Sequence, residues 1–198
     1  MTQATEAPSL PAASNHVQRL WATNVALTQV ADSQIPDVPE DLLASSEQAQ
    51  HHRIDVLGEH AATIRQLFTN AVTDLADIDR SLGVVVPAVE RVNLELQVWN
   101  PGFEIPVWVD SGPYLGWLFL SATPAQHSDS GSIAVLDPRA GSGMSAIPGL
   151  PWGTSLVIRP QRGGFAVVPG WLTSSVLPLE QHQTCVVVVA TTGSGDAG

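Results

Sequence analysis

The most informative stretch for the fold is residues 164–172, which read Gly164-Phe165-Ala166-Val167-Val168-Pro169-Gly170-Trp171-Leu172. A short apolar run stands between a glycine and a Pro-Gly pair, which is the pattern of a buried strand that ends in a turn. Runs of the same kind recur at residues 84–86, 94–99, 115–120, 132–136, 155–158, 164–168 and 185–190. Short strands at this spacing, joined by turn residues, predict a β-sandwich or barrel.

The chain before residue 83 has a different pattern. Apolar residues recur there every three or four positions, at Ile54, Leu57, Ala61, Ile64, Leu67, Phe68, Val72 and Leu75. This spacing predicts a helix with one apolar face. Pro39 suits a first helical turn, and Gly83 suits the position just after a helix end. We therefore expect helical support over residues 37–82 and a β core over residues 84–190, with one short strand between Leu20 and Val30.

The composition is that of one domain. The length of 198 residues and the 44% hydrophobic content suffice for one sizeable core. Residues 1–15 are rich in Thr, Ala, Pro and Ser, and residues 191–198 are rich in Gly, Ser and Thr. We expect a flexible N-terminus over 1–15, a single domain over 16–190 and a flexible tail over 191–198.

The charge excludes several classes of function. The 19 acidic residues outnumber the 8 basic ones, which gives a net charge of −11. A nucleic-acid-binding protein needs a basic surface, and a polybasic membrane anchor needs clustered cations, so neither is expected. All eight basic residues are Arg. Chemistry that depends on a lysine, such as a Schiff base or a P-loop, is therefore excluded.

The single cysteine, Cys185, stands in an apolar strand-like run, so it is expected to be an inert core thiol. A lone thiol forms no internal disulfide, which fits a reducing compartment. The N-terminus lacks the pattern of a signal peptide, and no apolar stretch is long enough to span a membrane. We predict a cytoplasmic protein.

Six segments together resemble the Fe(II)/2-oxoglutarate oxygenases related to prolyl 4-hydroxylases. These segments are Leu20–Val25, Val98–Gly102, Leu115–Leu120, Ser130–Ile133 leading to Asp137-Pro138-Arg139, Gly164–Leu172, and Val176-Leu177-Pro178. The resemblance covers most of the chain. It implies a mainly β fold with a helical N-terminal third, namely a double-stranded β-helix (jelly roll, cupin-like) buttressed by helices.

The same resemblance implies that the activity of the family is lost. The family's first two iron ligands would stand at Val107 and Val109, and the distal histidine would stand at Ser174. The residues around Cys185, where the family has an arginine for 2-oxoglutarate, contain no cation. A non-haem iron site needs two imidazoles and a carboxylate. The prediction is therefore a protein without a cofactor.

Other residues could carry chemistry. His127, Asp129 and His182 form an alternative metal triad, although each stands in a polar, turn-like segment. Asp110 is a candidate catalytic acid at the barrel mouth, or else the first residue of a turn with Ser111-Gly112-Pro113. Arg139 could bind a carboxylate or phosphate of a substrate, or pair with acidic groups on the surface.

Tryptophans mark the expected binding site. If the iron ligands became apolar, Trp99, Val107, Val109, Trp117 and Ser174 would line the old cavity and suit an apolar ligand. Bulky side chains could equally have closed that cavity.

Three hypotheses follow. The first is a metal-free protein that binds a small, largely apolar molecule, with a cyclase, isomerase or lyase activity as its catalytic form. The second is a non-catalytic partner of another protein. The third is an iron oxygenase with relocated ligands. The expected partner is a small molecule, and the oligomeric state, including a homodimer, stays open.

Overall fold

The computed structural model describes residues 23–44, 47–86, 88–127, 129–138 and 155–193. Its strands are β1 (Ala26–Gln29), β2 (Ala49–Arg53), β3 (Arg91–Trp99), β4 (Ile105–Trp108), β5 (Tyr114–Ala122), β6 (Ile133–Val135), β7 (Leu156–Ile158), β8 (Gly164–Pro169), β9 (Ser174–Val176) and β10 (Cys185–Gly193). The helix is α1 (His60–Ser81), and the short 3-10 turns are η2 (Asp32–Gln34), η3 (Glu40–Leu43) and η4 (Ile54–Leu57).

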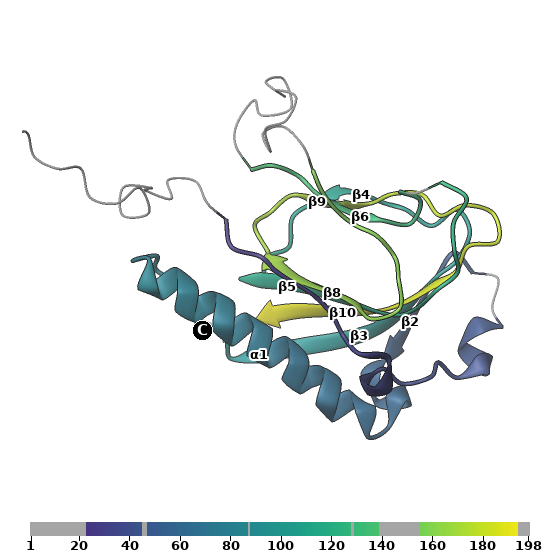
Figure 1. The fold of residues 1–198 in the computed structure, drawn as a ribbon, viewed down its shortest axis with the longest axis horizontal. Coiled ribbons are helices and arrows are strands. Elements are labelled where there is room, and N and C mark those ends of the chain that lie inside the picture. The colour runs from purple at the N-terminus through teal and green to yellow at the C-terminus, as the bar shows by residue number, and fades with distance from the viewer. Residues whose placement is uncertain (1–22, 45–46, 87, 128, 139–154, 194–198) are drawn as a thin grey trace, which may run out of the picture.

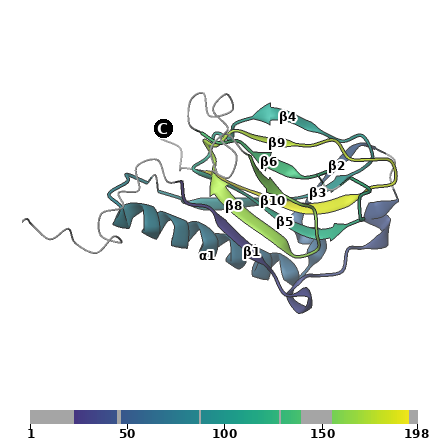
Figure 2. The same cartoon turned by 45° about the horizontal axis from the view of Figure 1, so that its top comes forward.

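The strands form two antiparallel sheets that face one another (Figure 2). The major sheet has the order β1-β8-β5-β10-β3-β2, and the minor sheet has the order β4-β9-β6-β7. From β3 to β10 the chain passes repeatedly between the sheets, since β3, β5, β8 and β10 lie in one and the other four in the other. This is a double-stranded β-helix, so the predicted fold class is confirmed.

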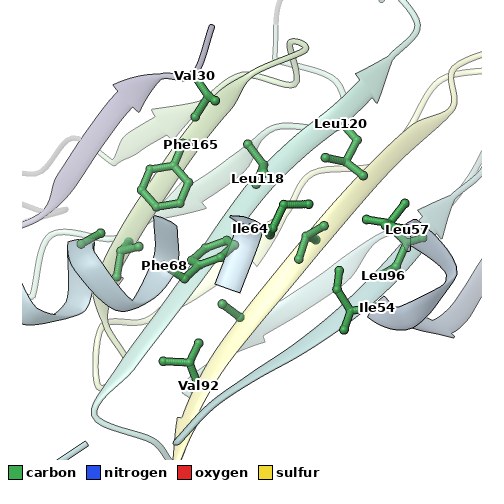
Figure 3. Packing of buried hydrophobic residues seen from close by; sticks show 14 of the residues in the cluster. Val30, Ile54, Leu57, Ile64, Phe68, Val92, Leu96, Leu118, Leu120 and Phe165 are labelled. Carbon is green, nitrogen blue, oxygen red and sulfur yellow. The ribbon is translucent and has the colours of Figure 1, made fainter. Parts of the chain in front are cut away.

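Helix α1 lies across the outer face of the major sheet (Figure 1). Its buried residues Ile64, Phe68, Val72 and Leu75 recur at helical spacing and point towards the strands, as Figure 3 shows for Ile64 and Phe68. The Phe68 ring lies 4.9 Å from that of Phe165 on β8. This burial of one apolar stripe supplies most of the helix's stability, since helices are marginal in isolation.

A second core lies between the two sheets. Its buried members are Trp99, Leu115, Trp117, Phe119, Ile133, Val135, Ile158, Ala166, Val168, Leu172, Val176, Leu179, Cys185 and Val187. Because side chains alternate along a strand, β5 and β10 send every second residue to this core and the others to the helix-side core. Both faces of these strands are buried, which explains their nearly continuous apolar runs.

The prediction of helix over residues 37–82 is wrong in its first half. Residues 49–53 form strand β2, which pairs with β3 from Ala49 opposite Trp99 to Arg53 opposite Glu95. The sequence Ala-Gln-His-His-Arg has little intrinsic strand preference, and the open edge of β3 supplies the pairing that overrides it. Ile54 and Leu57 are buried, yet they belong to η4. The predicted helix end is confirmed, because Gly83 follows α1 with a φ of +79°.

The predicted ends of the domain lie partly outside the described residues. Residues 1–15 and 194–198 are not among them. Residues 191–193 continue strand β10, so they belong to the sheet, contrary to the expectation of a tail that begins at residue 191. The short strand expected between Leu20 and Val30 is β1.

Candidate functional site

The candidate site lies at one edge of the inter-sheet core, where the end of β4 pairs with the start of β9 in the minor sheet. Trp108 at the end of β4 lies directly opposite Ser174 at the start of β9. Ser174 is fully buried, and Trp108 is half-buried. The Trp108 ring stands edge-on to Trp117 of the major sheet, with ring centres 6.5 Å apart and planes at 86°. We call this group, with Asp110, the mouth.

The structure corrects the predicted register of β4. Val107 and Val109 are 62% and 56% exposed, so they face away from the inter-sheet space and do not line it. The reason is a bulge in the β4–β9 ladder. Ile105 lies opposite Val176, and a regular ladder would then bring Val107 opposite Ser174, but one extra residue brings Trp108 there instead.

Trp108 is thus the site residue that the sequence reasoning missed. Sequence alternation counted from Ile105 selects Val107 and Val109, whereas the bulge selects Trp108. The one available signal was that Trp108 is the only large aromatic residue of its segment, and large aromatics are usually buried at least in part.

Asp110 closes a tight turn at the mouth. Its Oδ2 accepts a hydrogen bond from the backbone N–H of Gly112 at 2.8 Å, and its own N–H donates to the Gly170 carbonyl at 3.1 Å. A Cβ atom on Gly170 would lie 2.0 Å from the Gly112 carbonyl oxygen, so the two turns fit only with glycine there. The turn role considered for Asp110 is present, and the residue is half-buried two positions after Trp108.

Trp99 and Trp117 lie inside the inter-sheet core and are essentially unexposed. Trp99 stacks on Phe103 with ring centres 5.1 Å apart, and its indole N–H donates to Gln97 Oε1 at 2.9 Å. A buried indole needs such a partner because its N–H would otherwise lose a hydrogen bond to water. These two residues therefore form the interior wall, and Trp108 is the more accessible aromatic.

A polar chain leads from Trp99 to the surface. Gln97 donates to Glu95, and Glu95 pairs with His51 of β2 at 3.0 Å. Partial burial acts to raise the pKa of the Glu95 carboxyl, but the hydrogen bonds from His51 and Gln97 outweigh it and leave the pKa lowered. This series of hydrogen bonds and the ion pair link β2 to β3 and stabilise that edge of the major sheet.

The alternative triad of His127, Asp129 and His182 is not brought together. His127 Nδ1 pairs with Glu180 Oε1 at 2.7 Å, and Asp129 pairs with Arg159 at 3.1 Å. His182 stands in a turn with a φ of +70°. In the described part of the chain, no three His, Cys, Asp or Glu side chains gather as metal ligands. Arg139, the other predicted site residue, lies outside the described residues.

The mouth does not fit the iron and 2-oxoglutarate that this fold holds in the oxygenases. The polar or aromatic side chains there are the indole of Trp108, the carboxylate of Asp110 and the hydroxyl of Ser174. An indole offers a donor and no lone pair, so only one strong metal ligand is present. The sequence of β10 contains no arginine that could bind the carboxylate of 2-oxoglutarate.

Two solved structures resemble this chain over most of its length. A prolyl-4-hydroxylase from Pseudomonas putida matches with a TM-score of 0.62 and 11% identity, covering 88% of this chain and 94% of its own. HygX from Streptomyces hygroscopicus, solved with nickel and 2-oxoglutarate bound, matches with a TM-score of 0.51 and 12% identity, covering 87% and 84%. The chain has the fold of the Fe(II)/2-oxoglutarate oxygenases.

No protein-family model matches the sequence, and a comparison with curated proteins finds no relative. Among the residues that the structure describes, no helix combines the length and the apolar character needed to cross a membrane.

Proposed function

We propose that this chain is a degenerate oxygenase-fold protein that binds a small, largely apolar molecule at the mouth without a metal. The observation that supports this proposal is the directly opposed pair of Trp108 and Ser174, which places an indole and a buried hydroxyl together at the mouth. The ligand would be held by shape and a few polar groups, as in most small-molecule sites.

Trp108 would supply the apolar contact. Its ring packs edge-on against Trp117, which is buried, while its own side chain remains partly accessible. A flat aromatic surface at the rim of an apolar core favours a ligand with a ring or an alkyl chain.

Asp110 would supply the polar contact. Its Oδ2 accepts the Gly112 N–H, and no described residue donates a hydrogen bond to its Oδ1. A carboxylate oxygen at this place can accept a hydrogen bond from a ligand hydroxyl or amine. In a catalytic form it would move a proton on the bound ligand, as a cyclase, isomerase or lyase requires.

The test is a fluorescence titration with the neutral apolar probe N-phenyl-1-naphthylamine. We expect saturable binding to the unmodified protein and binding about tenfold weaker in Trp108→Ala, which loses the aromatic platform. The matched control is Trp171→Ala, because Trp171 is 56% exposed and lies outside the inter-sheet core.

Equal binding by the two variants, or no binding by the unmodified protein, would overturn the proposal and favour a non-catalytic partner protein. A second arm adds Fe(II) and 2-oxoglutarate and measures succinate. Formation of succinate would also overturn the proposal, in favour of an oxygenase.

A further inference from the structure

A second site lies on the other side of the major sheet, at the corner where β2 ends and the chain passes through η4 into α1. A pocket of about 210 Å³ opens there, lined by Arg53, Ile54, Asp55, Arg65, Asn93 and Leu94. Ile54 is buried in the helix-side core and Leu94 packs against it, so the floor of the pocket is apolar (Figure 3 labels Ile54). The mouth, in contrast, borders the inter-sheet core.

Two arginines line this pocket from two elements. Arg65 on α1 donates from Nη1 to the Val92 carbonyl at 2.6 Å, which fixes its guanidinium beside the edge of β3. Its Nε and Nη2 donate to no described residue. The second arginine is Arg53 at the end of β2, which uses only Nη2 in its bond to Asp55.

The ion pair between Arg53 and Asp55 is weak because both side chains are exposed. The two side chains are 88% and 66% exposed, with N and O 2.8 Å apart. Exposed pairs of this kind contribute about 0–1 kcal/mol, so an arriving anion can compete with Asp55 for the guanidinium.

The location is unusual in a protein with this charge. The chain has 8 basic residues, all Arg, against 19 acidic ones, and two of those Arg line this single pocket. The net charge of −11 repels anions at long range, but at physiological ionic strength this repulsion is screened beyond about 8 Å. Within that distance the local excess of guanidinium groups decides which ions bind.

We propose that this pocket binds the phosphate group of a small phosphate monoester. A planar carboxylate is satisfied by one guanidinium, whereas a phosphate presents oxygens in several directions and suits two guanidinium groups that come from a strand end and from a helix. The apolar floor of Ile54 and Leu94 would contact the carbon chain of the ester. This site is independent of the function proposed for the mouth.

The experiment is isothermal titration calorimetry with inorganic phosphate, followed by glycerol 3-phosphate, on the whole chain. We expect binding to weaken about tenfold in Arg53→Ala, since a charge-assisted hydrogen bond is lost. Because Arg53 makes only one exposed ion pair, this variant should fold normally. Arg65→Gln should weaken binding similarly.

Two further variants sharpen the test. Asp55→Asn removes the competing carboxylate and should tighten phosphate binding by about three- to tenfold. Arg80→Ala is the matched control, because Arg80 is an exposed Arg of α1 that pairs with Asp77 three residues before it, away from the pocket. It should bind phosphate like the unmodified protein.

The proposal is overturned if Arg53→Ala binds phosphate as tightly as Arg80→Ala, or if Asp55→Asn weakens binding. A flotation arm with phosphatidic acid in phosphatidylcholine vesicles separates the sources of the phosphate. Binding to these vesicles that depends on Arg53, without binding of glycerol 3-phosphate, would assign a lipid headgroup and overturn the small-molecule form of the proposal.

Discussion

Two histidines placed at the mouth should turn it into a metal site. Trp108 and Ser174 oppose one another directly, and Asp110 lies two residues beyond Trp108. Directly opposed residues have Cβ atoms about 4.5–5.5 Å apart, which lets two imidazoles share one ion. The variant Trp108→His/Ser174→His therefore presents two imidazoles and a carboxylate, the ligand set of non-haem iron sites.

The energetic cost of the two changes should be smaller together than separately. Ser174 is fully buried, so a histidine there alone should cost about 1–3 kcal/mol through overpacking. Trp108→His alone loses the ring contact with Trp117, worth about 0.5–1.5 kcal/mol. In the double variant the space left by the indole accepts the second imidazole, so we expect favourable coupling between the two sites.

Metal binding should then stabilise the double variant measurably. An ion at a hundred times its Kd adds about 2.7 kcal/mol to the free energy of unfolding. At about 2–4 °C per kcal/mol for a chain of this size, Tm should rise by roughly 5–11 °C. The assay is thermal unfolding with and without Co(II), together with the visible absorption of bound cobalt.

The matched control is Val107→His/Ser174→His. Val107 is exposed on the outer face, so its imidazole cannot meet the one at position 174. If this control binds Co(II) as tightly as the Trp108 variant, the bulged register is refuted. A folded Trp108 variant without cobalt absorption would contradict the expectation that positions 108, 110 and 174 can share one ion.

Three further predictions concern stability and reactivity. Phe68→Ala should lower the free energy of unfolding, measured in urea, by about 3–5 kcal/mol, because Phe68 is fully buried against Phe165. The control Thr69→Ala, at an exposed position, should change it little. A loss below about 1 kcal/mol in Phe68→Ala would contradict the helix-side core. Hydrogen bonds from two backbone N–H groups lower the pKa of the Glu180 carboxyl from its ordinary value of 4.5. The ionised carboxylate therefore stabilises the fold above that ordinary value, and this stabilisation is lost as the pH falls through the lower pKa of the folded state. Urea midpoints at pH 6 and pH 3.5 should therefore differ less in Glu180→Gln than in the unmodified protein, and an unchanged difference would argue against these bonds. Burial raises the pKa of the Cys185 thiol to about 12, so a thiol reagent at pH 8 should react only after unfolding, and rapid reaction of the folded protein would contradict its burial.

The strand β4 shows how far sequence reasoning can reach. The segment Ile105-Pro106-Val107-Trp108-Val109 carries apolar residues on both faces, so its local pattern does not say which face is buried. A shift of one residue moves every side chain to the opposite face. The bulge that sets the register depends on pairing with β9, some seventy residues later in the chain, and no local signal encodes it.

The polar strand β2 was missed for a related reason. Its residues have no strand-like alternation of apolar and polar types, and its conformation comes from the edge of β3 to which it binds. The phosphate pocket likewise joins Arg53, Arg65 and Asn93, which are separated in sequence and meet only where β2, α1 and β3 converge.

The sequence pattern by itself determined the mainly β class, the apolar face of α1 and the helix end at Gly83. These features follow from periodicity, turn residues and composition, which are local properties of the chain. The double-stranded β-helix was implied by the resemblance of six segments to an oxygenase family. Only the tertiary structure decided that Trp108 lies opposite Ser174 while Val107 and Val109 face outward. That choice depends on pairing between strands that are distant in sequence, and these strands pair only when the sheets form.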